Sequence, residues 1–168
     1  MSTTSTTHRT RTHLHPHGHD GASAPAHPVG LTRDAGWELG VRRTLPLTRD
    51  QAWELLRDAW LPRWLDVDAV PLVVGAELHR GAATAGRVVG AHLGRRLRVR
   101  WDQPDIDGET VLQVTLIDAA GGTTVAIHQE RLGTAEQRED LLARWTAELD
   151  ALRAEVGAAP ADDADLVG

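Results

Sequence analysis

The sequence predicts an α+β fold in which a curved antiparallel sheet wraps around one long C-terminal helix. Three patterns lead to this expectation: an early strand followed by short helices, a run of strands joined by short turns, and a long helical repeat at the end. Strands that follow one another directly, with the helices kept apart from them, are typical of α+β rather than α/β proteins.

The strands are predicted from alternating apolar and polar side chains. In the stretch RLRVRW, for example, Leu97, Val99 and Trp101 share one face and arginines occupy the other. Pro46 stops the first strand, and the glycine-rich residues 118–122 are expected to connect a hairpin. The expected strands cover residues 37–45, 73–81, 86–92, 95–101, 110–117 and 123–132.

Two capping boxes predict where helices begin. Thr48 and Thr134 are each followed three residues later by a glutamine, the pattern in which side chains and backbone cap a helix reciprocally. A short second helical piece is expected at residues 61–65. After Thr134, apolar residues recur at steps of three and four, which predicts a helix of about 22 residues, ~33 Å long, with Gly157 as its C-cap.

The composition favours one folded domain between two tails. Residues 1–33, rich in His and Thr, and the acidic residues 158–168 are expected to be disordered, which leaves residues 34–157 as the domain. Histidines alternate in the first tail, at His13, His15, His17 and His19. They are expected to bind metal only weakly, because no cysteine or acidic frame fixes a tetrahedral site; no resident metal or cofactor is expected.

Several classes of function are disfavoured by composition. The chain has no Cys and no Lys, so thiol chemistry and a lysine Schiff base are excluded. A net charge of −6 without a dominant basic patch speaks against nucleic acid as partner. No stretch is long and apolar enough for a membrane span, and no secretory signal is present, so a cytoplasmic location is expected.

Several phrases resemble a known superfamily. VRRTLPLTRDQAWELL, AWLPRWL, RLRVRW, TTVAIHQERL and QREDLLARWTAELDAL look like SRPBCC proteins, which have START-like, helix-grip domains. The branch most similar is the AHSA type, named for activators of the ATPase of heat-shock protein 90. The resemblance covers about residues 36–153 and implies a cavity between sheet and C-terminal helix. The branch name and the GC-rich codon usage behind Arg, Ala and Gly suggest a bacterial stress-response protein.

The resemblance implies a set of cavity-lining residues, to which the strand end at His128 adds a polar rim. The predicted ligand-binding residues are Trp53, Trp60, Trp64, Trp101, Val99, Val114, Ile127, His128, Arg131, Trp145 and Leu149. No catalytic motif is carried over. The tryptophans can either stack on a ligand or simply pack the core, since the chain has six Trp and no Phe or Tyr.

The sequence of the strand TVAIHQERL does not decide which of its two faces points into the cavity. If Ile127 faces inward, Gln129 and Arg131 mark the cavity mouth while His128 and Glu130 face solvent. The opposite phase turns His128 and Glu130 inward, where such a pair can perform general acid–base chemistry. The leading hypothesis is a non-enzymatic domain that binds a hydrophobic small molecule or lipid-like ligand. The alternatives are a chaperone-type or other protein-interaction module, and a polyketide cyclase- or aromatase-like enzyme that uses His128 or Glu130.

Overall fold

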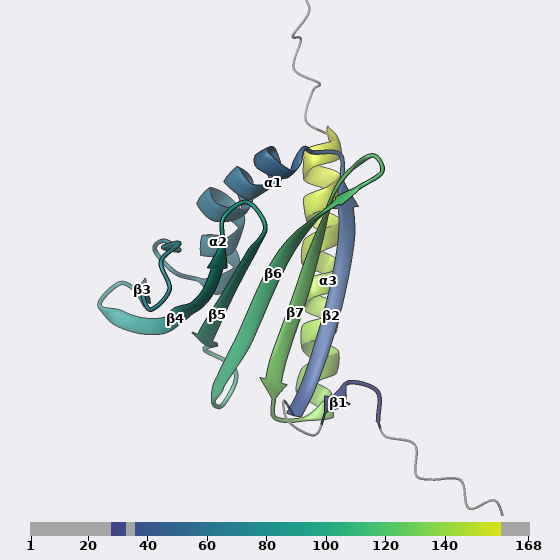
Figure 1. Ribbon diagram of the computed structural model, residues 1–168. Coiled ribbons are helices and arrows are strands. Elements are labelled where there is room, and N and C mark those ends of the chain that lie inside the picture. The colour runs from purple at the N-terminus through teal and green to yellow at the C-terminus, as the bar shows by residue number, and fades with distance from the viewer. Residues whose placement is uncertain (1–27, 33–35, 159–168) are drawn as a thin grey trace, which may run out of the picture.

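The fold consists of one antiparallel sheet and a set of helices on one of its faces (Figure 1). The computed structural model describes residues 28–32 and 36–158. The strands are β1 (Leu31–Thr32), β2 (Gly36–Leu45), β3 (Glu77–Arg80), β4 (Ala83–His92), β5 (Arg96–Asp102), β6 (Glu109–Ala119) and β7 (Gly122–Leu132). The helices are α1 (Arg49–Leu55), the π-helical segment η1 (Leu56–Trp60), α2 (Leu61–Leu65) and α3 (Ala135–Ala158).

The seven strands lie in the order β1-β2-β7-β6-β5-β4-β3, and every neighbouring pair is antiparallel. In Figure 1, α3 runs along the β2 and β7 side of the sheet, whereas α1 contacts β6 and β7 and continues through η1 into α2. The predicted α+β class, with a curved sheet around a long C-terminal helix, is confirmed.

The two expected N-terminal helical pieces form one uninterrupted run, residues 49–65. The predicted capping box is present. The backbone N–H of Gln51 donates to the Thr48 hydroxyl at 3.3 Å, and the backbone N–H of Thr48 donates to Gln51 Oε1 at 2.9 Å. The π-helical turn of η1 joins α1 to α2, and Pro62 lies in the first turn of α2. Asp66, with a left-handed φ of 52°, ends the run. The three tryptophans of the run, Trp53, Trp60 and Trp64, are buried.

The β6–β7 hairpin closes more tightly than the sequence indicates. Ala119 pairs with Gly122, which leaves only two residues in the turn. Gly122 has a φ of 143°, and a Cβ there would lie 1.9 Å from the carbonyl oxygen of Leu45. The second glycine is therefore required by the close approach of β2 as well as by its backbone conformation.

The phase of β7 changes near its end. Leu39 pairs with Gln129 but Trp37 pairs with Leu132, so β7 carries one extra residue in a β-bulge. Arg131 occupies the bulge with a φ of 65°. Strict alternation predicts that Leu132 shares a face with His128, and this is wrong: Leu132 joins the core with only 3% exposure because the bulge reverses the phase.

The helix α3 differs from expectation at both ends. At its start, the backbone N–H of Gln137 donates to Thr134 Oγ1 as predicted. The side-chain oxygen Oε1 of Gln137, however, accepts from the backbone N–H of Gly133 instead of that of Thr134. At its end, Gly157 is helical and has no left-handed φ, so the expected C-cap is wrong; α3 reaches Ala158, the last described residue.

Two further differences concern strands. Leu31 and Thr32, assigned to the N-terminal tail by composition, form β1 and pair with β2. Only Glu77–Arg80 of the expected strand 73–81 pairs with β4. Val73 and Val74 lie in the preceding turn and remain exposed, because β4 does not pair with them.

An ion pair joins β2 to the long helix α3. Arg43, which interrupts the apolar face of β2, places its Nε 2.6 Å and its second guanidinium nitrogen 3.3 Å from the two carboxylate oxygens of Asp150 on α3. The hydrogen bond to Arg43 holds the pKa of the Asp150 carboxyl below its usual value, and the same bond raises the pKa of Arg43.

Candidate functional site

Tryptophans occupy the space where the helical run 49–65 meets α3. Trp60, Trp64, Trp101 and Trp145 are each at most 2% exposed. The rings of Trp60 and Trp64 stack with centroids 6.2 Å apart, and Trp64 meets Trp145 edge to face at 5.6 Å. These contacts are those of close-packed aromatic side chains, so the rings fill the interior with one another.

Each of three interior indoles has a hydrogen-bond acceptor. Trp64 Nε1 donates to Glu148 Oε2 at 3.2 Å, and Trp101 Nε1 donates to the Leu65 carbonyl at 3.1 Å. Trp145 Nε1 donates to Gln129 Oε1 at 2.8 Å. Since a buried polar group without a partner is costly, these bonds fix the orientation of the rings as well as their burial.

A buried polar network lies beneath the N-terminal half of α3. It consists of Gln129, which is fully buried, with Gln103, Thr110 and Trp145. Gln129 Nε2 donates to Gln103 Oε1 at 3.3 Å and to Thr110 Oγ1 at 3.1 Å, and the Thr110 hydroxyl donates onward to the Trp101 carbonyl at 3.3 Å. Of the two phases that the sequence leaves open, the structure has the one with Ile127 inward; in it Gln129 was expected at a cavity mouth, whereas it lies fully buried.

This network borders a pocket at the open end of the sheet–helix interior, which we call the mouth pocket. It has a volume of ≈ 220 Å³ and lies between the β5–β6 loop and α3. Its walls combine two apolar side chains with amide, carboxylate and guanidinium groups. The lining residues are Gln103, Asp105, Ile106, Gln137, Asp140, Leu141 and Arg144.

Arg144 forms one wall of the mouth pocket and is held on three sides. Its guanidinium carbon lies 5.9 Å from the ring centroid of Trp101 and 5.5 Å from that of Trp145. The guanidinium also donates to the Trp64 carbonyl at 3.1 Å. Cation–π contact and this hydrogen bond together hold the side chain half-buried against the tryptophans.

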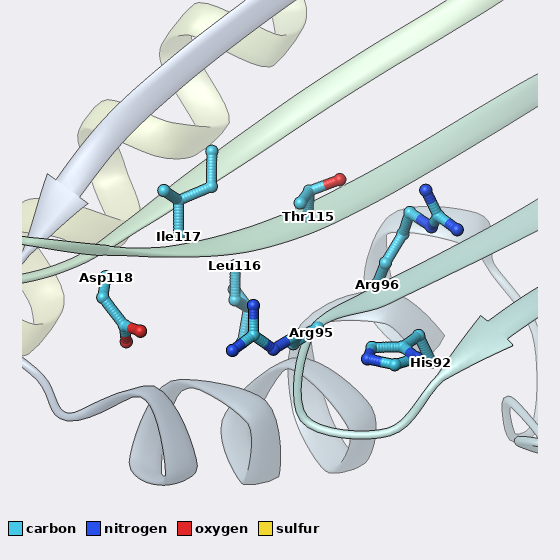
Figure 2. A pocket seen from close by; sticks show the side chains of 7 residues that line it. All are labelled: His92, Arg95, Arg96, Thr115, Leu116, Ile117 and Asp118. Atoms are coloured by element: carbon cyan, nitrogen blue, oxygen red, sulfur yellow. The ribbon is translucent and has the colours of Figure 1, made fainter.

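A second, wider pocket lies at the opposite end of β5, by the β4–β5 turn (Figure 2). It has a volume of ≈ 530 Å³ and is lined by His92, Arg95, Arg96, Thr115, Leu116, Ile117 and Asp118. Figure 2 shows the side chains of Arg96 and Thr115 on the opposite side of the strands from those of Arg95 and Asp118. Because the sheet separates its charged groups, this pocket is a weaker candidate than the mouth pocket.

The strand face that carries His128 points away from the interior. His128 is half-buried on the outer face of the sheet, with Nε2 3.5 Å from a Glu38 carboxylate oxygen. Glu130 lies on the same face and pairs with Arg98. Arg131, at the bulge, is exposed, and its guanidinium lies 3.9 Å from Glu109. None of these groups lines the mouth pocket.

Two of the three arginines of β5 have an acidic partner in the described part of the chain, and the third has none. Arg98 pairs with Glu130, and Arg100 Nε lies 3.6 Å from Glu109 Oε1. Arg96 has no acidic partner within residues 28–32 and 36–158. Most of this strip is therefore neutralised by carboxylates from neighbouring strands.

Residues 28–32 and 36–158 contain no group of three His, Asp or Glu side chains arranged to hold a metal ion. The alternating histidines, His13 to His19, lie outside the described residues. No helix in the described part of the chain is long and apolar enough to cross a membrane.

Solved structures with the same arrangement of sheet and helices identify the fold. The protein MLL2253 from Mesorhizobium loti superposes with a TM-score of 0.59 at 18% identity, over 74% of this chain and 99% of that one. CalU16 from Micromonospora echinospora gives 0.58 at 17% identity, over 74% of this chain and 80% of that one. The Aha1 dimer from Colwellia psychrerythraea gives 0.58 at 14% identity, over 74% of this chain and 98% of that one.

The chain has a helix-grip fold. The resemblance drawn from the sequence is thus confirmed for the fold. No protein-family model matches the chain, and no curated protein matches it in sequence.

Within this helix grip, most of the predicted binding residues are interior. Val99, Val114, Ile127 and Leu149 are at most 2% exposed and face the tryptophans from the sheet and from α3, and Trp53 is 8% exposed. None of the predicted residues lines the mouth pocket itself, whose walls come from a loop and from the polar side of α3. Sequence periodicity finds the core but gives no signal for a pocket built from loop residues.

Proposed function

We propose that the protein binds a small, largely apolar molecule in the mouth pocket of its helix grip. The observation that carries this proposal is that two apolar side chains, Ile106 and Leu141, lie among five polar or charged ones in a pocket beside the tryptophan-filled interior. Apolar contact together with polar groups that converge on one pocket is typical of small-molecule sites.

The volume of the pocket limits the size of the ligand. An apolar cavity of about 150 Å³ is enough to hold benzene. The ≈ 220 Å³ of the mouth pocket therefore suits a molecule of one or two fused rings rather than a long acyl chain. This narrows the hydrophobic or lipid-like ligand expected from the sequence to the smaller class.

Indane, a bicyclic hydrocarbon, is a suitable probe. We expect it to shift the NMR signals of the Trp145 and Trp101 indole N–H groups, which lie beside the pocket wall. Ile106→Ala should weaken indane binding about fivefold, because it removes roughly 1 kcal/mol of apolar contact.

Val73→Ala provides the matched control, since Val73 is 67% exposed and lies outside the mouth pocket. It should leave the affinity for indane unchanged. If indane causes no shift at millimolar concentration, or if both alanine variants weaken it equally, the mouth pocket is not a binding site for this class.

A protein-interaction role is the second candidate, and an open groove on the outer side of α3 favours it. Leu142, Ala143, Thr146 and Ala147 line this ≈ 620 Å³ groove between Glu139 and Asp150. We propose a second copy of the chain as occupant, which the Aha1 dimer among the structural neighbours supports. Sedimentation should then show a dimer that Ala147→Arg disrupts; a monomer at every concentration would count against this role.

A further inference from the structure

The hydrogen bonds behind the mouth pocket determine which end of the Gln103 amide the pocket offers to a ligand. The chain of bonds starts at Trp145, whose indole nitrogen can only donate. Its partner in Gln129, 2.8 Å away, must therefore be the amide oxygen. This requirement fixes the orientation of the Gln129 amide without reference to how its oxygen and nitrogen were assigned.

The orientation of Gln129 then fixes that of Gln103. With its oxygen turned to Trp145, Gln129 presents its NH₂ group to Gln103 at 3.3 Å and to Thr110 at 3.1 Å. Because an NH₂ group only donates, Gln103 must accept this hydrogen bond with its side-chain oxygen. The Thr110 hydroxyl is consistent with this arrangement, since its own hydrogen is directed to the Trp101 carbonyl at 3.3 Å.

The NH₂ group of Gln103 takes no part in these hydrogen bonds, and it faces the mouth pocket. Gln103 lines the pocket, and its Nε2 has no hydrogen-bond partner among the described residues. No fully buried side-chain nitrogen or oxygen in the described part lacks a partner, so this nitrogen is in contact with the pocket space.

We infer that the mouth pocket selects ligands that carry a hydrogen-bond acceptor, such as a ring ketone, through the NH₂ group of Gln103. This inference rests on the proposed function and specifies its ligand class. Gln129 acts as a positioning residue: it touches no ligand but prevents the Gln103 amide from turning its oxygen outward. The ligand ring that carries the acceptor packs against Ile106 and Leu141, the two apolar side chains of the pocket.

The test compares 1-indanone with indane, which have the same bicyclic skeleton apart from the carbonyl group. Gln103→Met keeps a side chain of similar length but removes the donor. We expect this variant to weaken 1-indanone about tenfold and to leave indane unchanged, because a buried acceptor that loses its partner costs about this much. In the wild-type complex, the side-chain NH₂ signals of Gln103 should shift more with 1-indanone than with indane.

Gln137→Met is the matched control, since Gln137 lines the same pocket but lies outside the chain of bonds from Trp145. It should leave the ratio of the two affinities unchanged. The inference is overturned if Gln103→Met weakens both probes equally or neither, or if Gln137→Met changes the ratio as much. Those results leave the proposed site standing as long as indane binds and Ile106→Ala weakens it; loss of indane binding itself refutes the proposed function instead.

Discussion

Replacing Gln129 by methionine tests whether the buried polar network stabilises the fold. Methionine is close to glutamine in length and flexibility but can neither donate nor accept as an amide does. The change leaves the Trp145 indole N–H without its acceptor at a fully buried position. The Thr110 hydroxyl keeps its bond to the Trp101 carbonyl.

The expected cost follows from the groups left without partners. An unpaired buried indole N–H costs about 2 kcal/mol, and the Gln103 oxygen, which loses its donor but belongs to an amide that can rotate toward the mouth pocket, adds about 1 kcal/mol. Burying a thioether in place of an amide offsets about 1 kcal/mol. The free energy of unfolding should therefore fall by about 2 kcal/mol. With a urea m-value of about 1.5 kcal/mol/M for a domain of this size, the midpoint should fall by about 1.3 M.

Urea unfolding followed by far-ultraviolet circular dichroism measures this shift independently of the tryptophan environment. Gln113→Met is the control: Gln113 is half-buried on the outer face of the adjacent strand, and its replacement should change stability by less than about 0.5 kcal/mol. In a Trp145→Phe background, Gln129→Met should cost almost nothing, because the donor is already gone. An equal cost in both backgrounds, or a wild-type midpoint for Gln129→Met, refutes the reasoning.

Three further predictions concern the hairpin, the ion pair between β2 and α3, and the outer face of the sheet. Gly122→Ala should destabilise the protein by at least about 2 kcal/mol in urea unfolding and far more than Gly121→Ala, because of these two glycines only Gly122 would bring an added Cβ against backbone, 1.9 Å from the Leu45 oxygen; equal costs would contradict the close approach. The Asp150 carboxyl has a folded-state pKa below its usual 3.8, so its pairing with Arg43 contributes stability above that value and loses it as pH falls through the folded pKa. Arg43→Gln should therefore flatten the fall in urea midpoint below about pH 4, and an unchanged pH profile would argue against the pair. His128→Ala should leave indane and 1-indanone affinities unchanged, since His128 lies on the outer face; a loss of more than about threefold by NMR titration would contradict this placement.

The periodic parts of the fold are predictable from the sequence because each repeats over many residues. The alternation of Leu97, Val99 and Trp101 and the repeat of apolar residues in α3 specify which side chains face the core. The capping box at Thr48 is a short-range signal that needs no tertiary information, and it is found as predicted. Fold class and core depend on these patterns alone.

The remaining features depend on single residues or on contacts between distant segments. The bulge at Arg131 reverses the phase of β7, and no alternation rule anticipates an arginine with a left-handed φ. The mouth pocket brings Gln103 and Ile106 from a loop to Arg144 and Leu141 on α3. The sequence does carry one signal for the network: Gln129 follows Val125 and Ile127 on the same face, and a glutamine that continues an apolar face is a candidate for a buried polar network.

Arg144 links three separate segments through its contacts with Trp64, Trp101 and Trp145. A ligand that pushes on this wall would have to move β5, α2 and α3 together, so the wall cannot yield locally. The pocket is therefore organised before a ligand arrives, and binding orders few side chains further. Such a rigid wall makes the entropic cost of association small and leaves selection among similar ligands to their fit in size and shape.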